Sequence, residues 1–156
     1  MKNVVTSMAL ALLTSVGMAQ TGVSFKDAKV ETAYNDYIQL KNALVASKPD
    51  EAKDAAGKLK TSLASVKEGK NAIAEATKIS KATNLDEIRK TFSSLSNEMK
   101  TVVKAGQVLK GELFVEYCPM ANNNTGAYWL SNEKEIKNPY FGDKMLKCGS
   151  VKETIR

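Results

Sequence analysis

Residues 84–106 read NLDEIRKTFSSLSNEMKTVVKAG, and this stretch carries the signals of one long helix. Asn84 is a favoured N-cap residue, and Glu87 follows three positions later, as in a capping box. Gly106 is a typical C-terminal stop. Between these ends the apolar residues recur at steps of three and four, the spacing of one helix face. They are Leu85, Ile88, Phe92, Leu95, Met99 and Val102.

Two segments before this helix have the same helical spacing. Residues 25–47 carry an apolar face that contains two tyrosines. Pro49 suits the first turn of a new helix, and a stripe rich in alanine and leucine continues through residues 50–82, as one helix or as two. Because short connections favour antiparallel neighbours, we predict a mainly α fold, with an antiparallel helical bundle over residues 24–106.

The sequence changes character after the helical part. Residues 113–117 (LFVEY) and 128–130 (YWL) contain strand-forming side chains, and the intervening stretch 122–126 (NNNTG) is rich in turn residues. We therefore predict a short β-hairpin and irregular, turn-rich structure in residues 107–156. With the bundle, this subregion forms a single predicted domain over residues 20–156.

Residues 1–19 have the pattern of a secretory signal peptide. Lys2 provides a positive start, an apolar stretch follows, and small residues at Gly17 and Ala19 precede a cleavage position before Gln20. No later stretch approaches the roughly 20 apolar residues that a transmembrane helix needs. We therefore expect an exported protein without a membrane span, in the periplasm if the cell has two membranes.

Charge and composition exclude several classes of function. The formal net charge is +6, from 23 basic and 17 acidic residues, but the positive charge is spread along the chain and Arg89 and Arg156 are the only arginines. Readers of nucleic acid usually concentrate arginine on one face, so nucleic acid is not an expected partner. The sequence has no histidine. This removes the commonest general base and the usual nucleophile–base pairs, so we predict that the protein is not an enzyme.

The C-terminal subregion holds the only two cysteines of the chain, each with a methionine nearby. Cys118 and Met120 are two residues apart, and Met145 and Cys148 are three apart. The first spacing gives one face of an extended backbone, and the second gives one face of a helical turn. Soft thiolate and thioether ligands select soft ions such as Cu(I). If the two pairs converge, these four sulfurs form a candidate site for Cu(I) or Ag(I), with Trp129 as a candidate neighbour of the ion.

A disulfide is the alternative for the same two cysteines. Paired cysteines in exported proteins commonly form a disulfide. A Cys118–Cys148 bond would close a loop of about 30 residues and stabilise the fold by roughly 3–4 kcal/mol. An oxidised pair offers no thiolate to a metal, so the two readings exclude each other at any moment, and the spacing leaves both open.

Four short motifs resemble a known family: residues 117–121 (YCPMA), 126–131 (GAYWLS), 138–142 (NPYFG) and 145–149 (MLKCG). They are similar to exported bacterial domains of unknown function, which occur alone or fused to the C-terminus of Cus-type periplasmic adaptor proteins of heavy-metal efflux pumps. The resemblance covers most of residues 20–156. It implies an association with copper or related metals and a heavy-metal efflux adaptor as partner.

These observations lead to two functional hypotheses. The first is an exported soft-metal protein that binds Cu(I) or Ag(I) and buffers the ion or delivers it to an efflux system. Its candidate ligands are Cys118, Met120, Met145 and Cys148. The second is a non-catalytic periplasmic interaction module that is stabilised by a Cys118–Cys148 disulfide. The sequence leaves the oligomeric state open.

Overall fold

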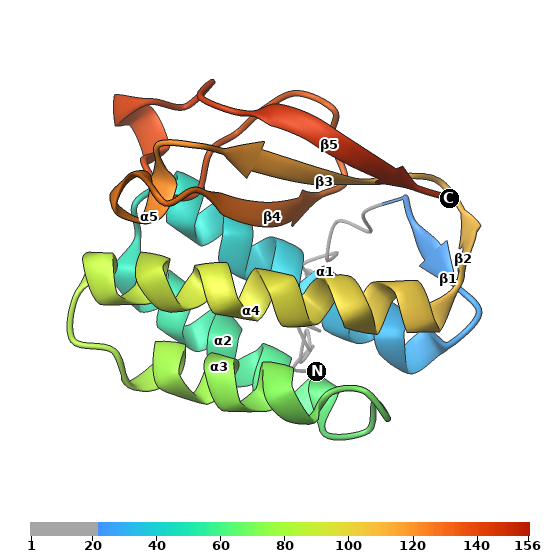
Figure 1. Ribbon diagram of the computed structural model, residues 1–156. Coiled ribbons are helices and arrows are strands. Elements are labelled where there is room, and N and C mark those ends of the chain that lie inside the picture. The colour runs from blue at the N-terminus through green and yellow to red at the C-terminus, as the bar shows by residue number, and fades with distance from the viewer. Residues whose placement is uncertain (1–21) are drawn as a thin grey trace, which may run out of the picture.

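The structure is a computed structural model, and it describes residues 22–156. The predicted signal peptide, residues 1–19, lies outside the described residues. The described chain is mostly helical, with two small antiparallel sheets (Figure 1). The three-stranded sheet covers one side of the pair α1 and α4, and α2 and α3 lie on the opposite side of that pair (Figure 1).

Short connections join most of the helices and strands along the chain. The helices are α1 (Ala28–Val45), α2 (Pro49–Leu63), α3 (Lys70–Lys81), α4 (Leu85–Gly106), the single turn α5 (Ala121–Asn124) and the 3₁₀ turn η1 (Gly142–Lys144). The strands are β1 (Ser24–Phe25), β2 (Val108–Lys110), β3 (Leu113–Cys118), β4 (Ala127–Ser131) and β5 (Ser150–Ile155). Within residues 22–156, each helix is too short or too polar to cross a bilayer.

The start of α4 confirms the predicted cap. The Asn84 side-chain oxygen accepts a hydrogen bond from the Glu87 backbone N–H at 2.9 Å. The Glu87 carboxylate in turn accepts from the backbone N–H of Thr83 at 2.9 Å and from its hydroxyl at 3.1 Å. The first bond satisfies a backbone N–H that the first turn of a helix leaves without an intrahelical partner, and the other two tie the residue before the N-cap to the helix.

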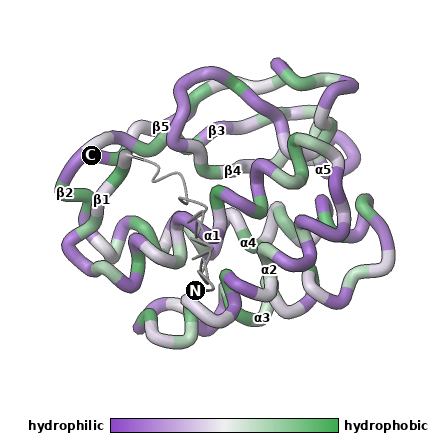
Figure 2. Tube along the Cα trace, turned by 180° about the vertical axis from the view of Figure 1, so that it is seen from behind, coloured by the Kyte–Doolittle hydropathy of each residue, from purple (hydrophilic) through white to green (hydrophobic). Residues whose placement is uncertain are grey.

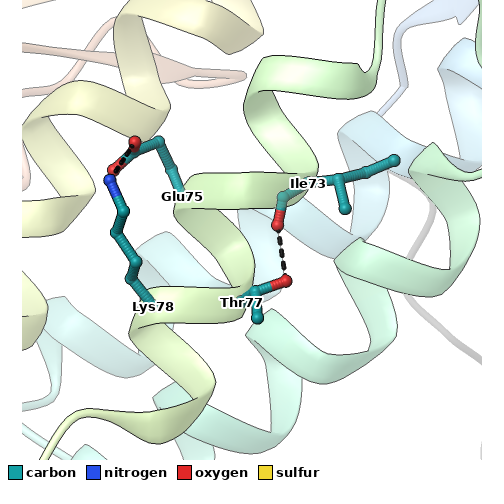
Figure 3. Close-up of polar contacts among 4 residues, drawn as sticks. All are labelled: Ile73, Glu75, Thr77 and Lys78. Carbon is teal, nitrogen blue, oxygen red and sulfur yellow. Dashed lines mark hydrogen bonds and ion pairs between the residues drawn. The ribbon is translucent and has the colours of Figure 1, made fainter.

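Residues 50–82, which the sequence left as one helix or two, form two helices. Pro49 is in the first turn of α2, and α2 ends at Leu63. A tight loop leads to Gly69, where an added Cβ would lie 2.5 Å from the Leu63 carbonyl oxygen. The chain therefore folds back onto the end of α2 before α3 begins. Along α3, Lys78 pairs with Glu75 at 2.7 Å, and the Thr77 hydroxyl donates to the Ile73 carbonyl at 2.7 Å (Figure 3).

Apolar residues of the helices and of the sheet share one continuous core. Hydrophobic and hydrophilic residues alternate along each long helix, as expected for helices with one buried face (Figure 2). Aromatic rings fill the space between helices and sheet: Tyr37 stacks on Phe92 with centroids 5.3 Å apart, and Tyr140 lies 5.8 Å from Phe92 and 5.9 Å from Trp129. These contacts fix the sheet on α1 and α4.

The predicted hairpin is confirmed, and the sheet is larger than predicted. β3 and β4 pair in antiparallel register from Phe114 opposite Ser131 to Cys118 opposite Ala127. β5 adds a third strand on the other side of β3, and β1 pairs with β2 in a separate two-stranded ladder. Neither β5 nor the β1–β2 ladder was predicted, since these strands are short or rich in polar residues.

Two tyrosine hydroxyls cover the outer edge of β4. The Leu130 backbone N–H donates to the Tyr37 hydroxyl at 3.0 Å, and the Tyr140 hydroxyl donates to the Tyr128 carbonyl at 2.5 Å. The Tyr37 hydroxyl also shares a 2.7 Å hydrogen bond with the Ser96 hydroxyl of α4. Backbone groups of an edge strand attract other strands when they are left open. Here they are used to hold the sheet against the helices.

Candidate functional site

The two cysteines come from distant parts of the chain and meet at one end of the sheet. Cys118 is the last residue of β3 and is fully buried, and Cys148 lies two residues before β5 and is partly exposed. Their sulfur atoms are 2.7 Å apart. This distance is longer than the roughly 2.05 Å of a disulfide bond and shorter than an ordinary contact between two sulfur atoms. The structure therefore brings together the two residues on which both sequence hypotheses depend.

Cys148 belongs to a tight turn with Met145. The Cys148 backbone N–H donates to the Met145 carbonyl at 3.0 Å, and this hydrogen bond closes a turn between residues that are three apart in the sequence. The hydrogen bond with the Cys118 thiol, followed by burial, raises the pKa of the Cys148 thiol to about 11. A thiol with that pKa is protonated at neutral pH, so binding of a metal ion would have to displace the proton.

The surroundings of the Met120 side chain differ from those of the two thiols. The chain is extended at Cys118, but Met120 has a helical backbone conformation, with φ −83° and ψ −13°, and it precedes α5. The premise that an extended backbone aims both side chains the same way is therefore wrong at Met120. Its side chain is 46% exposed and lines a groove of about 640 Å³ with the start of α4, residues 122–124 and Tyr140. Neither cysteine lines this groove.

Trp129 lies beside the turn that carries Cys148. The Trp129 side chain is fully buried, and its ring carbon Cη2 lies so close to Gly149 that an added Cβ there would be 2.8 Å from it. Gly149 directly follows Cys148 and has a φ of +144°, in the range that L side chains rarely adopt. The indole is thus next to the backbone of the cysteine turn, and its place beside a bound ion stays a prediction.

A buried polar group lies between the sheet and α1, and sequence reasoning missed it. Glu116 of β3 is 0% exposed, and neither of its carboxylate oxygens has a hydrogen-bond partner among the described residues. The Trp129 indole N–H and the Tyr34 hydroxyl are likewise buried without a partner in this part of the chain. Lys41 of α1 is also buried. The sequence signal for this buried group was a glutamate in the middle of the apolar run 113–118.

The electrostatics of this group follow from its burial. Burial raises the pKa of the Glu116 carboxyl to about 8, against the opposing effects of the nearby Lys41 ammonium and of the Trp129 N–H, which lies near the carboxyl but outside hydrogen-bond geometry. Burial also lowers the pKa of Lys41 and raises that of Tyr34. Each shift disfavours the charged form, as expected where water is excluded. In the described residues, no group of three or more His, Cys, Asp or Glu side chains is arranged to hold a metal ion.

Residues 33–111 match the protein family described as "Protein of unknown function (DUF3347)". The chain belongs to the DUF3347 family. The matched DUF3347 region runs from α1 through β2, so the two cysteines and the four motifs of residues 117–149 lie C-terminal to it. No curated protein and no solved structure matches the chain.

Proposed function

We propose that the protein is an exported carrier of Cu(I) or Ag(I), in which the thiolates of Cys118 and Cys148 are the principal ligands. The observation that supports this most is that the thiols of Cys118 and Cys148, from segments 30 residues apart, lie side by side. Two adjacent thiolates are soft ligands, and they favour Cu(I) over the harder ions that carboxylates bind. Met145, in the same turn as Cys148, is the candidate third ligand.

The proposed site needs a small adjustment to accept an ion. Metal–sulfur bonds are about 2.3 Å long, so two thiolates on one ion lie roughly 4 Å apart. Cys118 is buried at the end of a strand, whereas Cys148 is partly exposed, so the opening movement falls to the Cys148 side chain. Binding also releases the thiol protons, and the raised pKa of Cys148 makes the apparent affinity increase with pH.

Competition titration of the fully reduced protein tests this proposal. Cu(I), or Ag(I) as its redox-inert substitute, is titrated against a chelator that competes for the ion. We expect tight binding of one ion per chain in the wild type and its loss in the Cys118→Ser, Cys148→Ser double variant. Met145→Leu should weaken binding, and Met120→Leu is the matched control, because the Met120 side chain lines the groove. Binding that persists unchanged in the double cysteine variant contradicts the proposal.

The cellular role is part of the same proposal. Residues 1–19 direct export, residues 20–156 fold as one domain on an antiparallel helical bundle, and the protein delivers its ion to a heavy-metal efflux adaptor. The signal-like pattern and the four motifs support this role. Mass spectrometry of the protein from a periplasmic extract tests the export step: a chain that begins at Gln20 is expected, and a full-length chain retained with the cytoplasm would contradict it.

A second candidate is an interaction module in which Cys118 and Cys148 form a structural disulfide. The close approach of the sulfurs and the separate position of Met120 favour it, because a disulfide needs no thioether. Intact-mass measurement of freshly isolated, alkylated protein distinguishes the two candidates. A disulfide lowers the mass by about 2 Da and blocks alkylation, since two thiol hydrogens are removed. A reduced pair that carries a soft metal supports the carrier.

A further inference from the structure

The segment between β4 and β5, residues 132–149, contains one fully buried polar side chain, Asn138, which is 0% exposed. Both of its backbone groups hold the segment together. The Asn138 N–H donates to the Leu146 carbonyl at 2.8 Å, and its carbonyl accepts from the Gly142 N–H at 3.0 Å. Asn138 is therefore tied to the first residue of η1 and to the chain that follows η1.

The Asn138 side chain makes two further bonds, and one of them reaches the cysteine turn. Its amide nitrogen donates to the Cys148 carbonyl at 2.7 Å. Its amide oxygen accepts from the Tyr140 backbone N–H at 2.8 Å. The Cys148 N–H is held separately by the Met145 carbonyl. The peptide groups on both sides of the Cys148 side chain are thus fixed, one of them by Asn138.

We propose that Asn138 is a positioning residue that holds the Cys148 thiol against the Cys118 thiol. Cys118 needs no such support, because β4 pairs with it directly. Cys148 lies outside any strand, and β5 begins at Ser150. The position of one sulfur relative to the other therefore depends on the loop that Asn138 organises.

The chemistry of asparagine fits this role closely. A buried side chain at this position must donate to one carbonyl and accept from one N–H, and a neutral amide does both. Aspartate keeps the acceptor for Tyr140 but turns an oxygen towards the Cys148 carbonyl, where a donor is needed. Alanine removes both bonds and leaves two buried backbone groups unsatisfied.

The inference rests on the proposed function for its biological meaning, but its test does not need a metal. The reduced protein is equilibrated with oxidised and reduced glutathione. In this exchange one glutathione disulfide is reduced to two glutathione thiols while the two cysteine thiols become one protein disulfide. The equilibrium constant reports how well the fold presents the two sulfurs to each other. Ag(I) affinity is measured on the same proteins by chelator competition.

We expect Asn138→Asp to lower the equilibrium constant for disulfide formation by about tenfold or more, and to weaken Ag(I) binding at least as much. Ile79→Ala is the control: Ile79 is buried in α3, which packs against α2 and α4, so this change lowers stability away from the thiols. Its disulfide equilibrium should stay close to that of the wild type. Circular dichroism establishes that each variant is folded at the assay temperature. If Asn138→Asp does not fold, Asn138→Ser serves the same test, because a hydroxyl is too short to reach both partners.

Two outcomes separate this inference from the proposed function. If folded Asn138 variants keep the wild-type disulfide equilibrium, Asn138 is a loop-folding residue only and the inference is overturned. If the wild type binds no Ag(I) but the Asn138 variants lose disulfide stability, the metal proposal fails and Asn138 still positions the thiol pair.

Discussion

Replacing Glu116 by glutamine is expected to make the protein more stable at alkaline pH. The Glu116 carboxyl is buried beneath the sheet without a hydrogen-bond partner among the described residues. Its surroundings are Tyr34, Tyr37 and Lys41 of α1 and, from the sheet side, Trp129 and Glu133. Glutamine has nearly the same shape and carries no ionisable group, so it removes the titration and leaves the packing in place.

The sign and size of the effect follow from the two pKa values. The pKa of the carboxyl is 4.5 without the fold and about 8 within it. Below pH 4.5 the group is neutral in both states and does not affect stability. Between these values the unfolded chain ionises while the folded chain retains its proton, so stability falls as pH rises. Above pH 8 the loss is complete, and it amounts to at most about 5 kcal/mol, at about 1.4 kcal/mol for each pKa unit.

Urea denaturation at pH 5 and pH 8.5 measures this effect, with a constant concentration of reductant. The stability difference between Glu116→Gln and wild type should increase by about 2–4 kcal/mol between the two values of pH. Lys41→Met provides a second check: without the ammonium, the pKa of Glu116 rises further, so the loss of stability from Glu116 continues to higher pH than in the wild type. Parallel pH profiles for wild type and Glu116→Gln would refute the assignment of a neutral, buried carboxyl.

Three further substitutions test particular contacts, each by urea denaturation. Asn84→Ala should lower the free energy of unfolding by about 1 kcal/mol, because it removes the N-cap of α4; an unchanged midpoint would contradict the cap. Tyr37→Phe should cost about 1–3 kcal/mol, because the buried Leu130 N–H loses its acceptor; a cost near zero would mean that the N–H finds another partner. Gly149→Ala should destabilise by more than about 1 kcal/mol, since its Cβ would lie 2.8 Å from the Trp129 ring at a positive φ. A neutral result there would show that the indole moves aside.

The helices could be predicted from the sequence because their signals are local. The capping pair Asn84 and Glu87 and the three- and four-residue apolar steps define α4 without any tertiary information. Pro49 gave the start of α2 in the same way. The break between α2 and α3 is harder to predict, because it depends on how the chain at Gly69 packs on the end of α2.

The sheet and the site depend on contacts between distant residues, and this limited their prediction. β5 has an alternating exposed and half-buried pattern with charged residues, and only its pairing with β3 makes it a strand. The four-sulfur site was predicted from local spacing in two separate segments. The cysteines of those segments meet, but the backbone turns after Cys118, and Met120 faces a groove that neither cysteine lines. Spacing alone carries no information about that turn.

Titration of the reduced protein with Cu(I), followed by the ultraviolet absorption of the Cu(I)–thiolate bonds, tests the account most directly. The sulfurs of Cys118 and Cys148 share one small volume. The absorption should therefore rise to a sharp end point at one ion per chain, and it should be absent when both cysteines are serine. An end point that is the same in the double serine variant, or no thiolate absorption in the reduced wild type, would contradict the proposal that this thiol pair is a soft-metal site.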